Sequence, residues 1–95
     1  MRISIFGLGY VGAVCAGCLS ARGHEVIGVD ISQDKIDLIN LGKSPIVEPG
    51  LGELLARGIR TGRLRGTTHF ASAIRESDLS MICVGTPSKK NGDLE

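Results

Sequence analysis

The chain has 95 residues, enough for one small domain or for part of a larger one. Its 11 lysine and arginine residues nearly balance its 10 aspartate and glutamate residues. The net charge therefore gives no reason to expect nucleic acid or an anionic membrane as a partner. With no Trp, one Tyr and two Phe, the core must come from aliphatic residues, alanine and cysteine, as in parallel α/β sheets.

The sequence shows no targeting or membrane-spanning segment. The apolar run at residues 3–6 is too short for a secretory signal. The longest weakly polar stretch, residues 11–19, is about half of the roughly 20 residues that a spanning helix needs. Three cysteines are an odd number without the pattern of a disulfide framework. We therefore expect a cytosolic protein with reduced thiols.

The first elements alternate between strand and helix. Residues 2–6, RISIF, predict a strand that stops at Gly7. From residue 10 the apolar period becomes helical, and Gly23 stands where a helix end favours a left-handed residue. The buried face of this helix would consist of Val11, Val14, Cys15, Cys18 and Leu19.

A second strand and a second helix follow. Residues 25–30, EVIGVD, predict a strand buried on both faces because they are almost continuously apolar. Ser32 can cap a helix that buries Ile36 and Ile39 and ends near Gly42.

The second half begins with a loop at residues 43–50, KSPIVEPG, which contain two prolines and a glycine. A third helix follows from residue 51, and its apolar face would consist of Leu51, Leu54, Leu55 and Ile59. Residues 63–70 predict a weak strand, residues 71–78 a short helix, and residues 79–85, LSMICVG, a strand of the buried type.

The resulting order, β-α-β-α-α-β-α-β, predicts a parallel sheet with right-handed crossovers. The fold class is therefore α/β, a Rossmann-type doubly wound sheet. Four strands cover its first mononucleotide-binding half and the start of the second. Since the sequence stops in an apparent loop at NGDLE, we expect an incomplete domain at the N-terminus of a longer protein.

Three glycines at the end of the first strand form the pattern G-x-G-x-x-G, which is typical of dinucleotide binding. Gly7 would permit the tight turn out of the strand, and Gly9 would let the backbone approach a pyrophosphate. Gly12 would let the helix pack closely on the strand. The helix N-terminus would then offer N–H groups and a positive dipole end to the phosphates.

Three further residues are candidates for the same site. Asp30 lies at the end of the second strand, where a carboxylate can accept hydrogen bonds from ribose hydroxyls and repel a 2′-phosphate. It predicts NAD rather than NADP, although it could instead simply cap the next helix. Lys35 could reach the ribose edge or be an ordinary exposed lysine. Thr86 follows the fourth strand, where the loop borders the cofactor crevice.

The three cysteines are interpreted as packing residues. Cys15 and Cys18 form C-x-x-C, but they lie beyond the helix N-terminus, where a redox dithiol would have a lowered pKa. No second pair of ligands completes a zinc site. Cys83 lies inside an apolar strand. We therefore predict no metal site and no catalytic role for these thiols.

Long motifs connect the sequence with a known family. The segment MRISIFGLGYVGAVCAGCLSARGHEVIGVDIS, the loop KSPIVEPGL and the segment ICVGTP resemble the start of the UDP-glucose/GDP-mannose 6-dehydrogenases over essentially all 95 residues. Within that family, GKSPIVEPGL and CVGTPSKKNGDLE are most similar to the GDP-mannose enzymes of alginate-producing bacteria.

The resemblance implies a cytosolic enzyme that oxidises C6 of a nucleotide sugar twice, with two NAD⁺, and that converts GDP-mannose to GDP-mannuronate for alginate. It implies NAD contacts at Tyr10, Val11, Asp30, Lys35 and Thr86. The catalytic cysteine of the family would lie beyond residue 95, so no catalytic residue is assigned here. The resemblance also implies absent central and C-terminal domains and a homo-oligomer, with no nucleic acid or membrane partner.

Three alternatives stay open at this point. The first is a UDP-glucose 6-dehydrogenase, which shares the fold and the cofactor. The second is a non-catalytic NAD(H)-sensing module, since Rossmann domains also serve as redox sensors. The third is an FAD-binding domain, which uses the same glycine turn but typically has Glu where this chain has Asp30.

Overall fold

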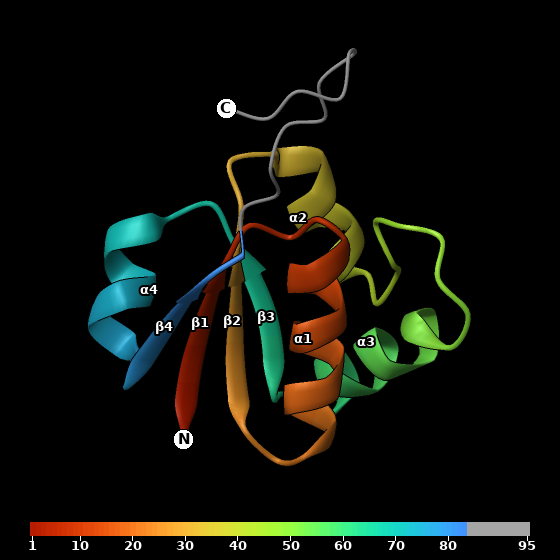
Figure 1. Cartoon of the computed structure of the whole chain (residues 1–95), viewed down its shortest axis with the longest axis horizontal. Coiled ribbons are helices and arrows are strands. Elements are labelled where there is room, and N and C mark those ends of the chain that lie inside the picture. The colour runs from red at the N-terminus through yellow and green to blue at the C-terminus, as the bar shows by residue number, and fades with distance from the viewer. Residues whose placement is uncertain (84–95) are drawn as a thin grey trace, which may run out of the picture.

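A computed structural model describes residues 1–83 as a four-stranded parallel sheet with helices on both faces (Figure 1). Its elements are β1 Arg2–Phe6, α1 Tyr10–Ala21, β2 Glu25–Val29, α2 Gln33–Asn40, α3 Leu51–Arg60, β3 Leu64–Thr67, α4 Phe70–Glu76 and β4 Leu79–Ile82. None of the helices within residues 1–83 is long and apolar enough to cross a lipid bilayer.

The strands lie in the order β3-β2-β1-β4, and every neighbouring pair is parallel. The chain therefore moves outward from β1 to β3, and then crosses back to place β4 on the other side of β1. This reversal confirms the predicted Rossmann-type topology. Because all strands are parallel, their carboxyl ends lie together at one end of the sheet, the upper end in Figure 1.

Two apolar clusters hold the layers together. Helices α1, α2 and α3 cover one face of the sheet and α4 covers the other (Figure 1). The larger cluster consists of Ile3, Ile5, Leu8, Ala13, Ala16, Val26, Ile36, Ile39, Leu51, Leu55 and Leu64. The smaller cluster, under α4, consists of Phe6, Ile27, Val29 and Ala73. Because β1 and β2 are covered on both faces, four of the five residues in each are buried. This burial was predicted for β2.

The predicted buried face of α1 is wrong. The helix buries its smallest residues, which are Gly12, Ala13, Ala16, Gly17 and Ser20. Val11 is 57% exposed, Cys18 is also exposed, and Val14, Cys15 and Leu19 are only partly buried. The physical reason is close approach, since a Cβ on Gly17 would lie 3.1 Å from Leu51 and 3.2 Å from Leu54 of α3. Small residues let α1 lie against the sheet and α3 at once, and apolar periodicity does not detect them.

Strand β4 also differs from its prediction as a buried strand. Leu79 and Ile82 are 48% and 69% exposed, respectively. Within residues 1–83, β4 pairs only with β1 and forms an edge of the sheet. The apolar sequence of β4 is typical of a strand with a neighbour on each side, and within residues 1–83 β4 has a neighbour on one side only.

The opposite edge, along β3, is covered by a side chain. Asn40, the last residue of α2, donates from Nδ2 to the carbonyl oxygen of Gly66 (3.1 Å). Its Oδ1 accepts from the N–H of the same residue (2.8 Å). One amide side chain thereby satisfies both backbone groups of a strand residue.

Candidate functional site

A hollow of about 440 Å³ lies at the carboxyl ends of the strands. It is lined by Phe6, Gly7, Gly9, Asp30, Ile31, Lys35, Phe70 and Cys83. Two other hollows, of about 330 and 410 Å³, lie elsewhere: the first is lined mainly by paired arginine and glutamate side chains, and the second lies along α3. The hollow at the strand ends therefore brings together four of the predicted cofactor residues, Gly7, Gly9, Asp30 and Lys35.

The glycine turn has the geometry that its sequence predicts. Gly7 has φ +99°, a left-handed conformation that disfavours residues with a Cβ, and its N–H donates to the carbonyl oxygen of Val29 (2.8 Å). A Cβ on Gly12 would lie 1.8 Å from the carbonyl oxygen of Gly7. Gly12 is therefore required because the first turn of α1 packs directly on the backbone of the turn.

Gly9 is different, because a Cβ at this position would meet no atom of residues 1–83 within 4 Å. Gly9 is also the N-cap of α1, and no side chain of the described residues caps this helix end. The first turn of α1 contains no acidic residue that would oppose an anion. The N–H groups of this turn are thus available to a phosphate group, which the positive end of the helix dipole would favour.

Asp30 is held in place by two backbone amides. Its side chain is mostly buried, at 9% exposed. Oδ2 accepts from the N–H of Leu8 (2.7 Å), and Oδ1 accepts from the N–H of Ser32 (2.9 Å). The cap of α2 is not Asp30 but Ser32, whose Oγ accepts from the N–H of Lys35 (3.3 Å). The simple capping role considered for Asp30 is therefore wrong.

The carboxyl group of Asp30 stays ionised at neutral pH. Burial alone would raise its pKa, but the hydrogen bonds from Leu8 and Ser32 and the charge of Lys35 outweigh burial and lower the pKa below its ordinary value of 3.8. A lowered pKa stabilises the folded state above that ordinary value, and this contribution is lost as the pH falls through the lower folded-state pKa. The pocket therefore presents a carboxylate with lone pairs left for hydroxyl donors.

The remaining predicted residues differ in how the structure places them. Tyr10 and Val11 open α1 beside Gly9 and are 58% and 57% exposed. Lys35 lines the pocket and is partly buried. Thr86 lies outside the described residues. Exposed apolar side chains beside a pocket are a common mark of a ligand site.

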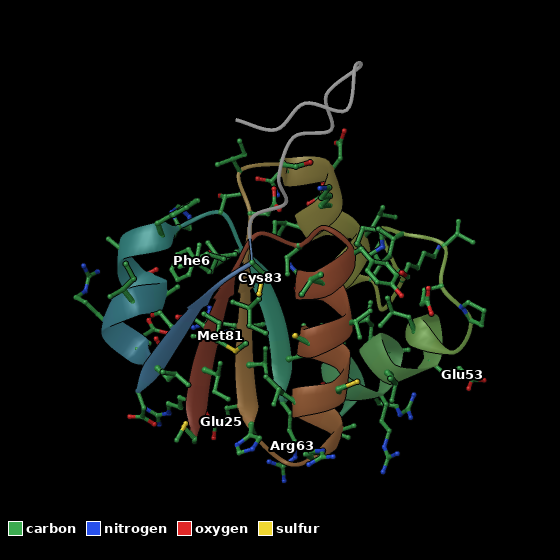
Figure 2. The ribbon with its side chains drawn as sticks, in the orientation of Figure 1. Phe6, Glu25, Glu53, Arg63, Met81 and Cys83 are labelled. Atoms are coloured by element: carbon green, nitrogen blue, oxygen red, sulfur yellow. The ribbon has the colours of Figure 1, made fainter. Side chains whose placement is uncertain are left out.

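Several lining residues were missed by sequence reasoning. Ile31 directly follows Asp30 and is 84% exposed at the pocket. Phe70, from α4, packs on Phe6 with ring centroids 5.3 Å apart. Figure 2 shows the Phe6 side chain on the side of the sheet that faces α4, near the strand ends. Ile31 could have been suspected as an apolar residue beside the acidic one, whereas no sequence signal brings α4 to this site.

Leu8 was also missed, although it stands between the first two glycines. It is completely buried, and its side chain lies over Gly28 of β2, where a Cβ would come within 3.1 Å of it. Together with the hydrogen bond from its N–H to Asp30, this packing anchors the turn at both backbone and side chain. A large aliphatic residue between two glycines was the available signal.

The three cysteines differ in their exposure. Cys18 is exposed, whereas Cys15 and Cys83 are partly buried against the larger apolar cluster. Cys83 lies at the strand ends, on the side of the sheet that faces α1 (Figure 2). Burial, and next the neighbouring Cys15 thiol, raise the pKa of the Cys83 thiol, which keeps it protonated and weakly nucleophilic at neutral pH. The packing interpretation therefore fits Cys15 and Cys83 but not Cys18.

The pocket thus combines an uncapped helix end for phosphate groups with a fixed carboxylate for a pair of hydroxyls. Apolar walls at Ile31 and Phe70 suit a flat ring system. A nucleotide carries all three of these chemical groups.

Known proteins resemble the chain over its entire length. Residues 1–95 match the model of the UDP-glucose/GDP-mannose dehydrogenase family, NAD binding domain. The chain is 86% identical to a GDP-mannose 6-dehydrogenase of Pseudomonas syringae pv. syringae over 95 residues, which are 100% of the chain and 22% of that protein. A UDP-glucose 6-dehydrogenase of Rhizobium meliloti is 42% identical over 90 residues, which are 95% of the chain and 21% of that protein.

Among solved structures, the ternary complex of GDP-mannose dehydrogenase from Pseudomonas aeruginosa matches with a TM-score of 0.94 and 79% identity. This match covers 100% of the chain and 22% of that structure. The chain thus spans about a fifth of the length of the curated relatives that it matches.

Proposed function

The chain belongs to the UDP-glucose/GDP-mannose dehydrogenase family, as an NAD-binding domain, and from this premise we propose that it is the cofactor-binding part of a GDP-mannose 6-dehydrogenase. The observation that carries the substrate class is the 86% identity to a GDP-mannose enzyme, against 42% to a UDP-glucose enzyme. The product would be GDP-mannuronate, for alginate biosynthesis.

The cofactor is NAD, in keeping with the family's NAD-binding domain, and it supplies the hydride acceptor of the reaction when bound. We propose that the backbone at Gly7, Gly9 and Gly12 and the start of α1 hold its pyrophosphate. Asp30 would hold the ribose hydroxyls of the adenosine half and disfavour a 2′-phosphate, so NAD is expected over NADP. The tight packing of Gly12 and the open space at Gly9 support this placement.

Four other residues complete the proposed cofactor contacts. Tyr10 and Val11 would contact the cofactor from the exposed first turn of α1. Lys35 would do so from the pocket wall, where its charge also lies near Asp30. Thr86 would contribute from the loop after β4.

The complete enzyme would carry the remaining parts of the reaction. We propose that residues 1–95 form the first part of a Rossmann domain, followed by the rest of that domain and by central and C-terminal domains. The nucleophilic cysteine would lie in that later sequence. A cytoplasmic homo-oligomer is the proposed setting, with a nucleotide sugar as substrate and neither nucleic acid nor a membrane as partner.

The decisive experiment measures NADH formation. The full-length protein is mixed with NAD⁺ and with either GDP-mannose or UDP-glucose, and the absorbance of NADH is followed. We expect two NADH for each GDP-mannose and little from UDP-glucose. Turnover of UDP-glucose instead would keep the family and discard the substrate. NAD binding without turnover of either sugar would favour a sensing module.

A second prediction concerns the thiols. Cys15→Ala and Cys18→Ala should leave the rate of NADH formation nearly unchanged, because neither residue lines the pocket. Cys15→Ala should cost about 1 kcal/mol of stability because its side chain is partly buried, whereas Cys18→Ala should stay within about 0.5 kcal/mol. Steady-state kinetics and thermal melting of the full-length variants test this. A folded Cys15→Ala protein without activity would contradict the packing role.

A further inference from the structure

The contact between Asp30 and Leu8 joins two parts of the cofactor pocket. Asp30 lies at the end of β2, where the proposed ribose site is, and Leu8 lies in the glycine turn, where the proposed pyrophosphate site is. Their hydrogen bond spans 22 residues of sequence and is buried, with an Oδ2–N distance of 2.7 Å. The carboxylate of Asp30 is therefore in direct contact with the glycine turn itself.

The rest of the turn leaves the Leu8 amide dependent on this contact. Gly7 donates its N–H to Val29 and so follows the sheet. The helical hydrogen bonds of α1 begin where the N–H of Ala13 donates to the carbonyl oxygen of Gly9 (2.9 Å). Leu8 lies between these two ladders and is completely buried. A buried N–H without a partner is costly, so the carboxylate of Asp30 determines which way this peptide faces.

We propose that Asp30 is a positioning residue for the glycine turn, which sets the pyrophosphate site in its binding conformation in addition to contacting the ribose. The carboxylate suits this role because Ser32 fixes its second oxygen (2.9 Å). A charged acceptor held at two points resists rotation more than a residue held at one. The extension to cofactor affinity rests on the proposed NAD site.

The first test measures amide hydrogen exchange in the full-length protein without cofactor, at single-residue resolution. Asp30→Ala should speed exchange at Leu8 by about tenfold or more, since a hydrogen bond to a charged group contributes that much to local closure. Exchange in β1 and β2 should not change. Asp30→Asn keeps one acceptor oxygen and should give an intermediate rate. Asp34→Ala, which removes an exposed carboxylate from the first turn of α2, is the matched control and should leave Leu8 unaffected.

The second test separates positioning from ribose contact. Titration calorimetry compares NAD⁺ with an NAD⁺ analogue whose adenosine half is 2′,3′-dideoxyadenosine and cannot donate to Asp30. If Asp30 acts only on the ribose, wild type and Asp30→Ala will bind the analogue equally. The proposal requires Asp30→Ala to bind the analogue about tenfold more weakly, with partial recovery in Asp30→Asn.

Unchanged exchange at Leu8, or equal binding of the analogue, would overturn the proposal. Faster exchange throughout β1 and β2 would also overturn it, because Asp30 would then support the fold in general. The exchange measurement needs neither cofactor nor sugar. The exchange result can therefore support the positioning role of Asp30 even if the NADH assay contradicts the proposed function, and the NADH assay can support the function even if exchange at Leu8 is unchanged.

Discussion

Gly12→Ala is expected to destabilise the folded protein by about 3 kcal/mol or more, at the upper end of the usual cost of overpacking. The added methyl group would lie 1.8 Å from the carbonyl oxygen of Gly7 and 2.9 Å from its carbonyl carbon. Both atoms belong to the backbone, and Gly7 is tied to Val29 by its own N–H. The turn cannot yield without losing that hydrogen bond, so α1 must move away from the sheet.

Urea unfolding and thermal melting of the full-length variant measure this loss. The control is Gly52→Ala in α3, where a Cβ would meet no atom of the described residues within 4 Å. Alanine is a better helix former than glycine, so this variant should be neutral or gain up to about 1 kcal/mol. Equal stability of the Gly12 and Gly52 variants would contradict the packing that places α1 on the turn.

Gly9→Val is expected to leave the protein folded and to weaken NAD binding by about 3 kcal/mol or more. The valine side chain would fill the proposed position of the pyrophosphate, whose oxygens would lose their hydrogen bonds from the backbone. Gly9 has φ −78° and ψ −154°, an extended and not a left-handed conformation. The Cβ of the valine would meet no atom of residues 1–83 within 4 Å. That space is where the pyrophosphate is proposed to approach the backbone.

Titration calorimetry with NAD⁺ and a melting curve of the same variant give the two readouts. Valine is a poor N-cap, so a stability loss of about 1 kcal/mol is expected even without a clash. Normal NAD affinity in a folded Gly9→Val protein would move the pyrophosphate site away from this residue. The contrast with Gly12→Ala is the informative result, because it separates a glycine needed for packing from a glycine proposed to contact the ligand.

Much of the fold could be predicted because strand and helix patterns alternate without ambiguity. The strand at residues 2–6 ends at Gly7, and Ser32 caps α2, as expected from the sequence. The helix face of α1 could not be predicted from apolar periodicity. Its contacts are set by distance to the sheet and to α3, and glycine, alanine and serine satisfy that distance better than valine or cysteine.

The candidate site was predictable where a residue type performs one mechanical task. Gly7 needs a left-handed turn, and Gly12 needs the absence of a Cβ. Asp30 was predicted as a ligand contact, but its hydrogen bond to Leu8 depends on how β2 and the turn meet in space. The contribution of Phe70 likewise depends on the crossing of α4 over the sheet. Contacts between distant segments carry no local signature.

The side chain of Asn40 makes the two outer strands of the described sheet, β3 and β4, unequal. By occupying both the N–H and the carbonyl oxygen of Gly66, it takes the place that a neighbouring strand would need, and so it guards the β3 margin against edge-to-edge aggregation. The β4 margin has no such guard within residues 1–83 and carries exposed Leu79 and Ile82. Within residues 1–83 the sheet is therefore asymmetric: the backbone of Gly66 on β3 is already paired, whereas the outer side of β4 is open to a further strand.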